Sequence, residues 1–209
     1  MSNDKLLITE LLSGRLLHDL AGSMGGIMFG LEELEFGNQE EALSLIKESF
    51  NDLLAKYKLM RQAYSISDDN LSFEQTKSNI ENYLLKRKTK FTLEVSHFDA
   101  SINCIEKVNK IISSLILTIS GTVADIEQIS ALLNYTENKI SLTIKISNEH
   151  KPLSRYFVDQ LTSKSKIDLN TKNINIYLTS LLLEQYNTEI HFICKNNFIE
   201  INLSILSDT

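Results

Sequence analysis

Residues 15–26 read RLLHDLAGSMGG and lie within a helical pattern of apolar residues that runs from Leu6 to Phe36. On a helix that turns by about 100° per residue, these apolar residues gather on one side and His18 falls well away from it. Five of the seven glycines belong to the same pattern, although each costs a helix interior about 1 kcal/mol relative to alanine. We therefore expect an exposed His18 beside a bare surface. Its own strip of the helix carries Gly22, Gly25 and Phe29, and the adjacent strip carries Arg15, Asp19 and Gly26.

A second helical pattern follows the first almost at once. The pair Gly37-Asn38 suits a left-handed cap and a tight reversal. Apolar residues then recur every three or four positions from Ile46 to Tyr64, as in a helical bundle. The two helices should form an antiparallel hairpin. Because each has a broad apolar face, two hairpins paired as a four-helix bundle would cover both faces, and we expect a homodimer.

The character of the sequence changes after a polar joint at residues 65–70. Helical patterns then alternate with segments in which apolar and polar residues alternate as in strands. This order predicts a two-layer α/β sandwich. The fold class is therefore α+β, with a hairpin domain at residues 1–68 and a sandwich domain at residues 69–209. The predicted elements of the sandwich are helices at 72–88, 105–119, 154–161 and 171–185, and strands at 91–97, 127–135, 139–147, 189–194 and 198–206.

Composition narrows the classes of function. The net charge of −6 disfavours nucleic acid, whose phosphates are bound by clustered Lys and Arg. The one basic run, at residues 86–90, is typical of a solvated helix end. Cys104 and Cys194 lack the paired spacing of a metal site or a disulfide framework. The sequence contains no signal-peptide pattern and no apolar run long enough to span a membrane, so we expect a cytoplasmic protein that binds neither nucleic acid nor membrane.

Residues 11–20 (LLSGRLLHDL) and 30–34 (GLEEL) resemble the histidine box of sensor histidine kinases. The length and the order of elements are more similar to the ChpT-type histidine phosphotransferases. This resemblance implies that the hairpin dimerises as a four-helix bundle and that His18 carries a phosphoryl group between receiver domains. It also implies that the sandwich is related to a kinase ATP-binding domain but no longer binds nucleotide. Two positions depart from related boxes, since Ser23 replaces a proline and Gly22 replaces a polar residue that orients water, which argues against phosphatase activity by that route.

The residues themselves also argue against ATP binding. A kinase ATP site needs glycine-rich loops, because the backbone must approach the nucleotide. Gly121 is the single glycine between residues 38 and 209, and residues 148–152 (NEHKP) stand where kinases carry an Asp-x-Gly-x-Gly loop. Ser114 and Thr118 align with two asparagines typical of kinases. We therefore expect no bound cofactor and no ATP-dependent autokinase activity.

His18 is the expected nucleophile. A neutral imidazole attacks phosphorus well near neutral pH, and an aspartyl phosphate is a high-energy acyl phosphate. Asp19 would orient the ring or act electrostatically, and Arg15 would hold phosphate or the acidic cluster of a receiver. Alternatively, Arg15 and Asp19 form a solvated pair within the helix.

The surface beside His18 is the expected docking site. Gly22, Gly25 and Gly26 would let a receiver approach, and Phe29 is either an anchor for that receiver or core between the two domains. The magnesium ion that shields the transferring phosphoryl group would come with the receiver. We also hypothesise that the sandwich offers receivers a second docking surface.

These observations predict a dimeric histidine phosphotransferase of a two-component phosphorelay. The donor would be the receiver domain of a hybrid histidine kinase, and the acceptor would be the aspartate of a second response regulator. The alternative is a non-catalytic dimeric module that binds receivers or other regulators. An intact autokinase is a third possibility, and it requires nucleotide binding.

Overall fold

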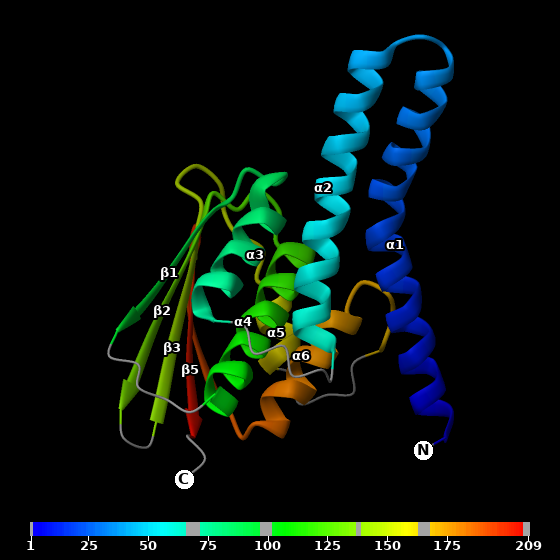
Figure 1. Cartoon of the computed structure of the whole chain (residues 1–209). Coiled ribbons are helices and arrows are strands. Elements are labelled where there is room, and N and C mark those ends of the chain that lie inside the picture. The colour runs from blue at the N-terminus through cyan, green and yellow to red at the C-terminus, as the bar shows by residue number, and fades with distance from the viewer. Residues whose placement is uncertain (1, 66–71, 97–101, 137–138, 163–167, 207–209) are drawn as a thin grey trace.

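The computed structural model describes residues 2–65, 72–96, 102–136, 139–162 and 168–206. A long helical hairpin stands beside a layered α/β body (Figure 1). The hairpin consists of α1 (Ser2–Glu35) and α2 (Gln39–Tyr64). Gly37 makes the reversal with φ at +95°, a left-handed conformation that glycine adopts without steric cost. The predicted hairpin and its turn are confirmed.

Two glycines let α1 approach α2 closely. A Cβ on Gly26 would collide with the side chain of Ser49, and a Cβ on Gly30 would lie 2.6 Å from Ile46 Cγ1 and 3.2 Å from the carbonyl oxygen of Ala42. These separations are too short for carbon contacts. Gly26 therefore lies against Ser49 of α2 and not on the bare surface beside His18, which corrects its predicted place there.

The close approach at Gly30 can be tested by adding one methyl group. Gly30→Ala should lower the free energy of unfolding by about 1–3 kcal/mol, because overpacking must push α2 away from α1. Gly25→Ala is the matched control, since no described atom lies within 4 Å of a Cβ at that position. There, alanine should add up to about 1 kcal/mol through its helix propensity. Urea unfolding measures both variants, and equal stabilities would show that the hairpin does not depend on the close approach.

The body is built on a mixed sheet whose strand order, over the described residues, is β1-β2-β3-β5-β4. β1 and β2 pair in parallel, and the other neighbours pair antiparallel. Both predicted strand hairpins are present, whereas the parallel pair joined by a crossover helix was not predicted. The strands are β1 (Lys90–Ser96), β2 (Gln128–Thr136), β3 (Lys139–Ser147), β4 (Glu189–Lys195) and β5 (Phe198–Leu206).

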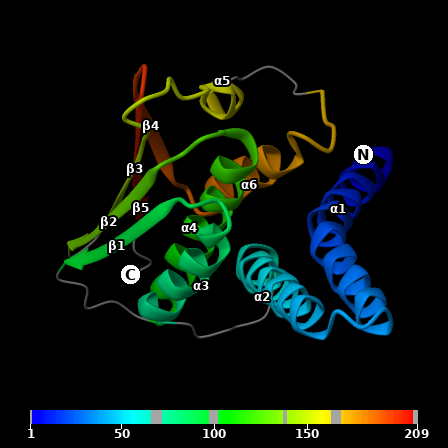
Figure 2. The same cartoon turned by 90° about the horizontal axis from the view of Figure 1, so that it is seen from above.

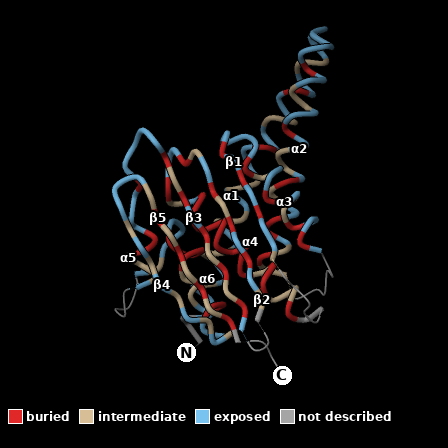
Figure 3. The backbone as a smooth tube through the Cα atoms, turned by 90° about the vertical axis from the view of Figure 1, so that its left-hand side faces the viewer, coloured by how far each residue is buried: buried red, intermediate tan, exposed pale blue. Residues whose placement is uncertain are grey.

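Helices cover one face of this sheet and separate it from the hairpin (Figure 2). They are α3 (Phe73–Leu85), α4 (Ile102–Thr122), α5 (Tyr156–Thr162) and α6 (Ile174–Gln185). The central helix is α4, which is buried between the layers as its apolar sequence predicted; Ile111, Leu115 and Ile119 are fully buried. Figure 3 shows the buried residues running through the sheet and the helices packed on it. The predicted α+β fold is confirmed.

The C-terminal half of α2 packs against α3 and α4. Leu59 of α2 is fully buried in the main hydrophobic core, and Leu16 and Leu20 of α1 pack against the same core. Gln62 of α2 donates a hydrogen bond to Thr76 Oγ1 of α3 at 2.6 Å. The half of the hairpin that contains the first part of α1 and the last part of α2 is therefore packed on the body. The residues of α1 near His18 lie beside the body.

Some predicted boundaries moved or cannot be compared. α3 ends at Leu85, before the predicted residue 88, and Leu85 is 75% exposed. Lys88 then adopts φ at +56°, which is incompatible with continuing the helix. The predicted joint at residues 65–70, the domain boundary between residues 68 and 69 and the strand end at residue 97 fall wholly or largely outside the described residues.

Candidate functional site

His18 lies on the outer side of α1, and its side chain is 82% exposed. Ser23, five residues later, faces α2 and donates a hydrogen bond to Asp52. Five steps of about 100° place His18 about 140° round the helix from that contact. The imidazole is therefore open to a partner that approaches from outside the hairpin.

Asp19 supports the ring of His18 from the side of the body. Asp19 Oδ1 lies 3.4 Å from His18 Nδ1, and Asp19 Oδ2 accepts a hydrogen bond of 2.9 Å from Arg15 Nε. The side chains of Arg15 and Asp19 are 20% and 19% exposed. The pair is thus half-buried rather than fully solvated, and it leaves His18 Nε2 free to face a partner.

Arg15 joins α1 to the end of α4. A Cβ on Gly121 would lie 3.5 Å from Arg15 Nη2, so the guanidinium packs against the last turn of α4. The carbonyl groups at the C-terminus of a helix carry partial negative charge, which favours a cation at this place. Arg15 therefore orients Asp19 and contacts the body, and its predicted contact with phosphate stays a prediction.

Tyr64 is a partly buried neighbour of this pair that the sequence did not single out. Burial raises the pKa of Tyr64 well above its ordinary value, with the nearby Tyr83 and Asp19 adding to the effect and Arg15 opposing it. The hydroxyl has no hydrogen-bond partner within the described part of the chain. Tyr64 is consequently neutral at physiological pH, so it adds no charge beside Arg15 and Asp19.

The strip of α1 that carries His18 is bare and partly apolar. A Cβ on Gly22 or on Gly25 would have no described atom within 4 Å, and Phe29 is 55% exposed. Phe29 is therefore on the surface and not in a core between the domains. Gly22, Gly25 and Phe29 are thus exposed on the strip of His18, and their part in docking a receiver stays a prediction.

Ser23, which stands where related boxes have proline, belongs to a polar network inside the hairpin. It is 2% exposed and donates to Asp52 Oδ2 of α2, while Lys56 Nζ donates to Ser23 Oγ at 2.9 Å. Lys56 Nζ also lies 2.8 Å from Asp52 Oδ2, and Lys86 Nζ of the body lies 3.8 Å from the same oxygen. The network links α1, α2 and the end of α3.

The network fixes the charge of Asp52. Burial acts to raise the pKa of Asp52, but hydrogen bonds from Lys56 and Ser23 and the charges of Lys56 and Lys86 outweigh it, so the pKa lies below its ordinary value. A carboxyl group with a lowered folded pKa stabilises the protein above its unfolded pKa of about 3.9. That stabilisation is lost as the pH falls through the folded value.

Asp52→Asn should therefore lower stability mainly at neutral pH. Loss of the charged partner should reduce the free energy of unfolding by about 1–3 kcal/mol at pH 7. Below pH 4, roughly the unfolded pKa, the difference from the wild type should shrink. Urea unfolding at pH 7 and pH 3 measures this, with the exposed Glu32→Gln as control. A deficit that is the same at both values of pH would contradict the charge-based explanation.

Ser114 and Thr118, the two positions compared above with kinase asparagines, are covered by α6. Thr179 Oγ1 of α6 lies 2.8 Å from Thr118 Oγ1 and 3.1 Å from Ser114 Oγ. All three side chains are about 1% exposed. Thr118 also donates to the carbonyl oxygen of Asn175 at 3.2 Å. Their hydroxyl groups therefore serve the contact between α4 and α6.

The loop at residues 148–152 is held by its own side chain. Asn148 is 3% exposed, and its Oδ1 accepts hydrogen bonds of 2.8 Å from the backbone N–H groups of His150 and Lys151. Its amide group donates to the carbonyl oxygen of Asp125. In this way Asn148 closes the turn through its own side chain.

A second face of the hairpin is apolar and uncovered. Helical spacing places its members about a third of a turn from the contact between α1 and α2, on the same side of both helices. These side chains are between 37% and 70% exposed: Leu17, Met24, Met28 and Leu31 on α1, and Leu43, Phe50, Leu54 and Tyr57 on α2. We call them the apolar face; it is distinct from the strip of His18.

Neither a metal site nor a membrane span is found in the described ranges. No group of three or more His, Cys, Asp and Glu side chains there could hold a metal ion. No helix among them is long and apolar enough to cross a membrane.

Comparisons with known proteins identify the fold. No model of a protein family matches the sequence. A solved structure described as a bacterial phosphotransferase matches 95% of this chain and 96% of its own length, with a TM-score of 0.78 and 20% identity. The chain has the fold of this phosphotransferase.

A second match is to part of a longer chain. The histidine kinase ThkA, solved in complex with the response regulator protein TrrA, matches 99% of this chain and 64% of its own chain, with a TM-score of 0.53 and 13% identity. The resemblance inferred from residues 11–34 is thus confirmed for the fold.

Proposed function

We propose that this chain is a histidine phosphotransferase of a two-component phosphorelay, in which His18 takes a phosphoryl group from one receiver aspartate and passes it to another. The observation that carries the proposal is that His18 is exposed and lies next to the Asp19 carboxylate on the hairpin. The fold of the whole chain matches that of a bacterial phosphotransferase. The donor would be a receiver of a hybrid histidine kinase, and the acceptor would be a response regulator.

The geometry suits nucleophilic attack through Nε2. Because Nδ1 faces Asp19, the lone pair of Nε2 can form the N–P bond while the P–O bond to the receiver aspartate breaks and the carboxylate leaves. The proton stays on Nδ1, where the Asp19 carboxylate offsets the positive charge of the phosphorylated ring. Attack by a second aspartate reverses these steps. Magnesium held by the receiver would neutralise charge on the transferring group.

The apolar face supports a homodimer. Eight large apolar side chains stand at least 37% exposed on one side of the hairpin, and exposed patches of this kind mark protein interfaces. A second copy of the same face would cover them as a four-helix bundle. His18 lies outside this face, so the dimer would leave both histidines open to receivers.

Two features support phosphate uptake from a partner rather than from ATP. The hydroxyl groups of Ser114 and Thr118 are hydrogen-bonded to Thr179 in a buried contact. Asn148 fills the turn that a glycine-rich loop would form. A nucleotide would have to displace both arrangements.

Incubation with a phosphorylated receiver domain tests the proposed function. Label should appear on this chain in an acid-labile and alkali-stable form, as expected of phosphohistidine, and should move on to a second receiver. Calorimetric titration with Mg-ATP should give no binding heat. Receiver binding without label would favour the non-catalytic interaction module, and labelling from ATP would favour an autokinase.

A further inference from the structure

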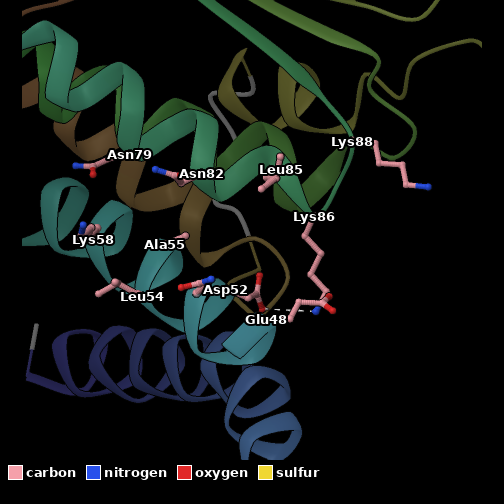
Figure 4. Close-up of a pocket in the computed structure, with 11 residues that line it drawn as sticks. Glu48, Asp52, Leu54, Ala55, Lys58, Asn79, Asn82, Leu85, Lys86 and Lys88 are labelled. Atoms are coloured by element: carbon pink, nitrogen blue, oxygen red, sulfur yellow. Dashed lines mark ion pairs between the residues drawn. The ribbon is translucent and has the colours of Figure 1, made fainter. Parts of the chain in front are cut away.

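Arg15 connects the surroundings of His18 to the end of α4. It stands three residues before His18, and a Cβ on Gly121 of α4 would lie 3.5 Å from its Nη2. A groove of about 690 Å³ between α2 and the end of α3 (Figure 4) is a different part of the molecule, because its lining residues come from positions 48–58 and 79–88. Its three lysines are largely offset by Glu48 and Asp52. The body therefore reaches the proposed transfer site at Arg15 and not through that groove.

Gly121 is the single glycine between residues 38 and 209, and its backbone does not require one. The left-handed conformation that favours glycine occurs at Gly37 and not at Gly121. Within a helix, glycine is about 1 kcal/mol less favourable than alanine. An alanine Cβ would just touch the Arg15 guanidinium, and a larger side chain would compete with it for the same place. Gly121 therefore gives the guanidinium room to lie on α4.

Neighbouring apolar residues hold this side of α1 on the body. Leu16 and Leu20, which directly follow Arg15 and Asp19, pack against the main hydrophobic core. Helical spacing places His18 about 60° from Arg15 and about 100° from Asp19. The His18 side chain is 82% exposed, whereas those of Arg15 and Asp19 are 20% and 19% exposed. The guanidinium thus lies on the body side of His18 and not on the side from which a receiver would approach.

The carboxylate of Asp19 is shared between Arg15 and His18. Its Oδ2 accepts the hydrogen bond of 2.9 Å from Arg15 Nε, and its Oδ1 lies 3.4 Å from His18 Nδ1. In a neutral imidazole, the hydrogen bond made by one nitrogen decides which nitrogen carries the proton. Because a carboxylate only accepts hydrogen bonds, this arrangement selects Nδ1–H and leaves the lone pair on Nε2. Without Arg15 the carboxylate could rotate, and water could bond to either nitrogen of the exposed ring.

We propose that Arg15 is a positioning residue, supported by the last turn of α4, which holds the Asp19 carboxylate so that His18 keeps its lone pair on Nε2. This inference rests on the proposed function. It differs from a direct contact of Arg15 with phosphate. It gives the α/β body a part in transfer, because the end of α4 supports the group that orients the nucleophile.

Arg15→Gln tests the role of the guanidinium. Nitrogen NMR of the neutral His18 ring in the free protein, assigned by comparison with His18→Ala, should change from the Nδ1–H tautomer to a mixture of both tautomers. With a phosphorylated receiver, kcat should fall about tenfold at an unchanged KM, because orientation and not binding is lost. Arg15→Lys should recover most of kcat, since an ammonium group four residues before Asp19 can still pair with it. Arg155→Gln, at an exposed arginine of the body, is the matched control and should behave as the wild type.

Gly121 tests the same role from the body. Gly121→Ile should give the mixed tautomers and the lower kcat of Arg15→Gln, because a side chain branched at Cβ has little freedom to turn away from the guanidinium. Gly121→Ala is the control, since its Cβ would lie at an ordinary contact distance, and it should keep the wild-type tautomer and kcat. Position 121 is exposed, so neither variant overpacks a buried core. A wild-type tautomer and kcat in Gly121→Ile would overturn the support from α4.

The outcomes separate the two proposals. If Arg15→Gln raises the KM and keeps the wild-type tautomer, Arg15 contacts phosphate or the receiver directly and the positioning proposal is wrong. If the wild type takes label and Arg15→Gln keeps both the tautomer and kcat, the positioning proposal is also wrong and the proposed function stands. If the wild type takes no label from any receiver, the proposed function is wrong.

Discussion

His18→Ala should reduce phosphoryl transfer to background, a loss on the order of a thousandfold or more, as expected when a covalent nucleophile is removed. The physical reason is that the N–P bond requires the ring nitrogen of this residue. Because the side chain is 82% exposed, its removal should leave the free energy of unfolding nearly unchanged. Single-turnover transfer from a labelled receiver gives the rate, and urea unfolding checks the fold.

A second histidine provides the control for this experiment. His191 of β4 is exposed and lies on the sheet rather than on the hairpin. His191→Ala should transfer at the wild-type rate. Transfer by His18→Ala at the wild-type rate, or an equal loss in His191→Ala, would rule out His18 as the phosphate carrier.

Met24→Glu should weaken the homodimer roughly a hundredfold or more. Met24 is on the apolar face and is 52% exposed in the single chain. In a two-fold dimer the substitution occurs twice, and an unpaired charge buried in an interface costs several kcal/mol, where each 1.4 kcal/mol is about tenfold in Kd. Sedimentation equilibrium over a range of concentrations measures the change.

Phe36→Glu is the matched control for the dimer. Phe36 is 81% exposed and is also apolar, but it lies in the turn directly after α1 and not on the apolar face. This variant should associate as the wild type does. If Met24→Glu and the wild type have the same mass at all concentrations, the apolar face does not hold two chains together.

The glycines of α1 show which features of the structure helical periodicity can predict and which it cannot. Their spacing correctly separated the His18 strip from the apolar side of the helix, because residues about 100° apart keep a fixed angular order. It did not show that Gly26 and Gly30 contact α2 while Gly22 and Gly25 face solvent. That difference depends on which side of α1 meets α2, and a single helical pattern does not contain this information.

The sequence also did not predict the polar network at Ser23. The only local signal was a serine in place of the usual proline, with Asp52 and Lys56 spaced as an ion pair on the second helix. Burial of Ser23 against Asp52 follows from the register between antiparallel helices, which the turn at Gly37 fixes. The contact of Arg15 with the end of α4 joins residues more than a hundred positions apart, and no short-range pattern predicts it.

The sequence by itself determined the helical hairpin, the strand hairpins of the α/β body and an exposed His18, because alternation of apolar and polar residues is a local property of helices and strands. The tertiary structure alone decided how these elements face one another. It placed Asp19 between His18 and Arg15, closed Ser114 and Thr118 with α6, and brought three lysines into one groove. Such placements arise from the packing of whole faces, whose partners lie far away in the chain.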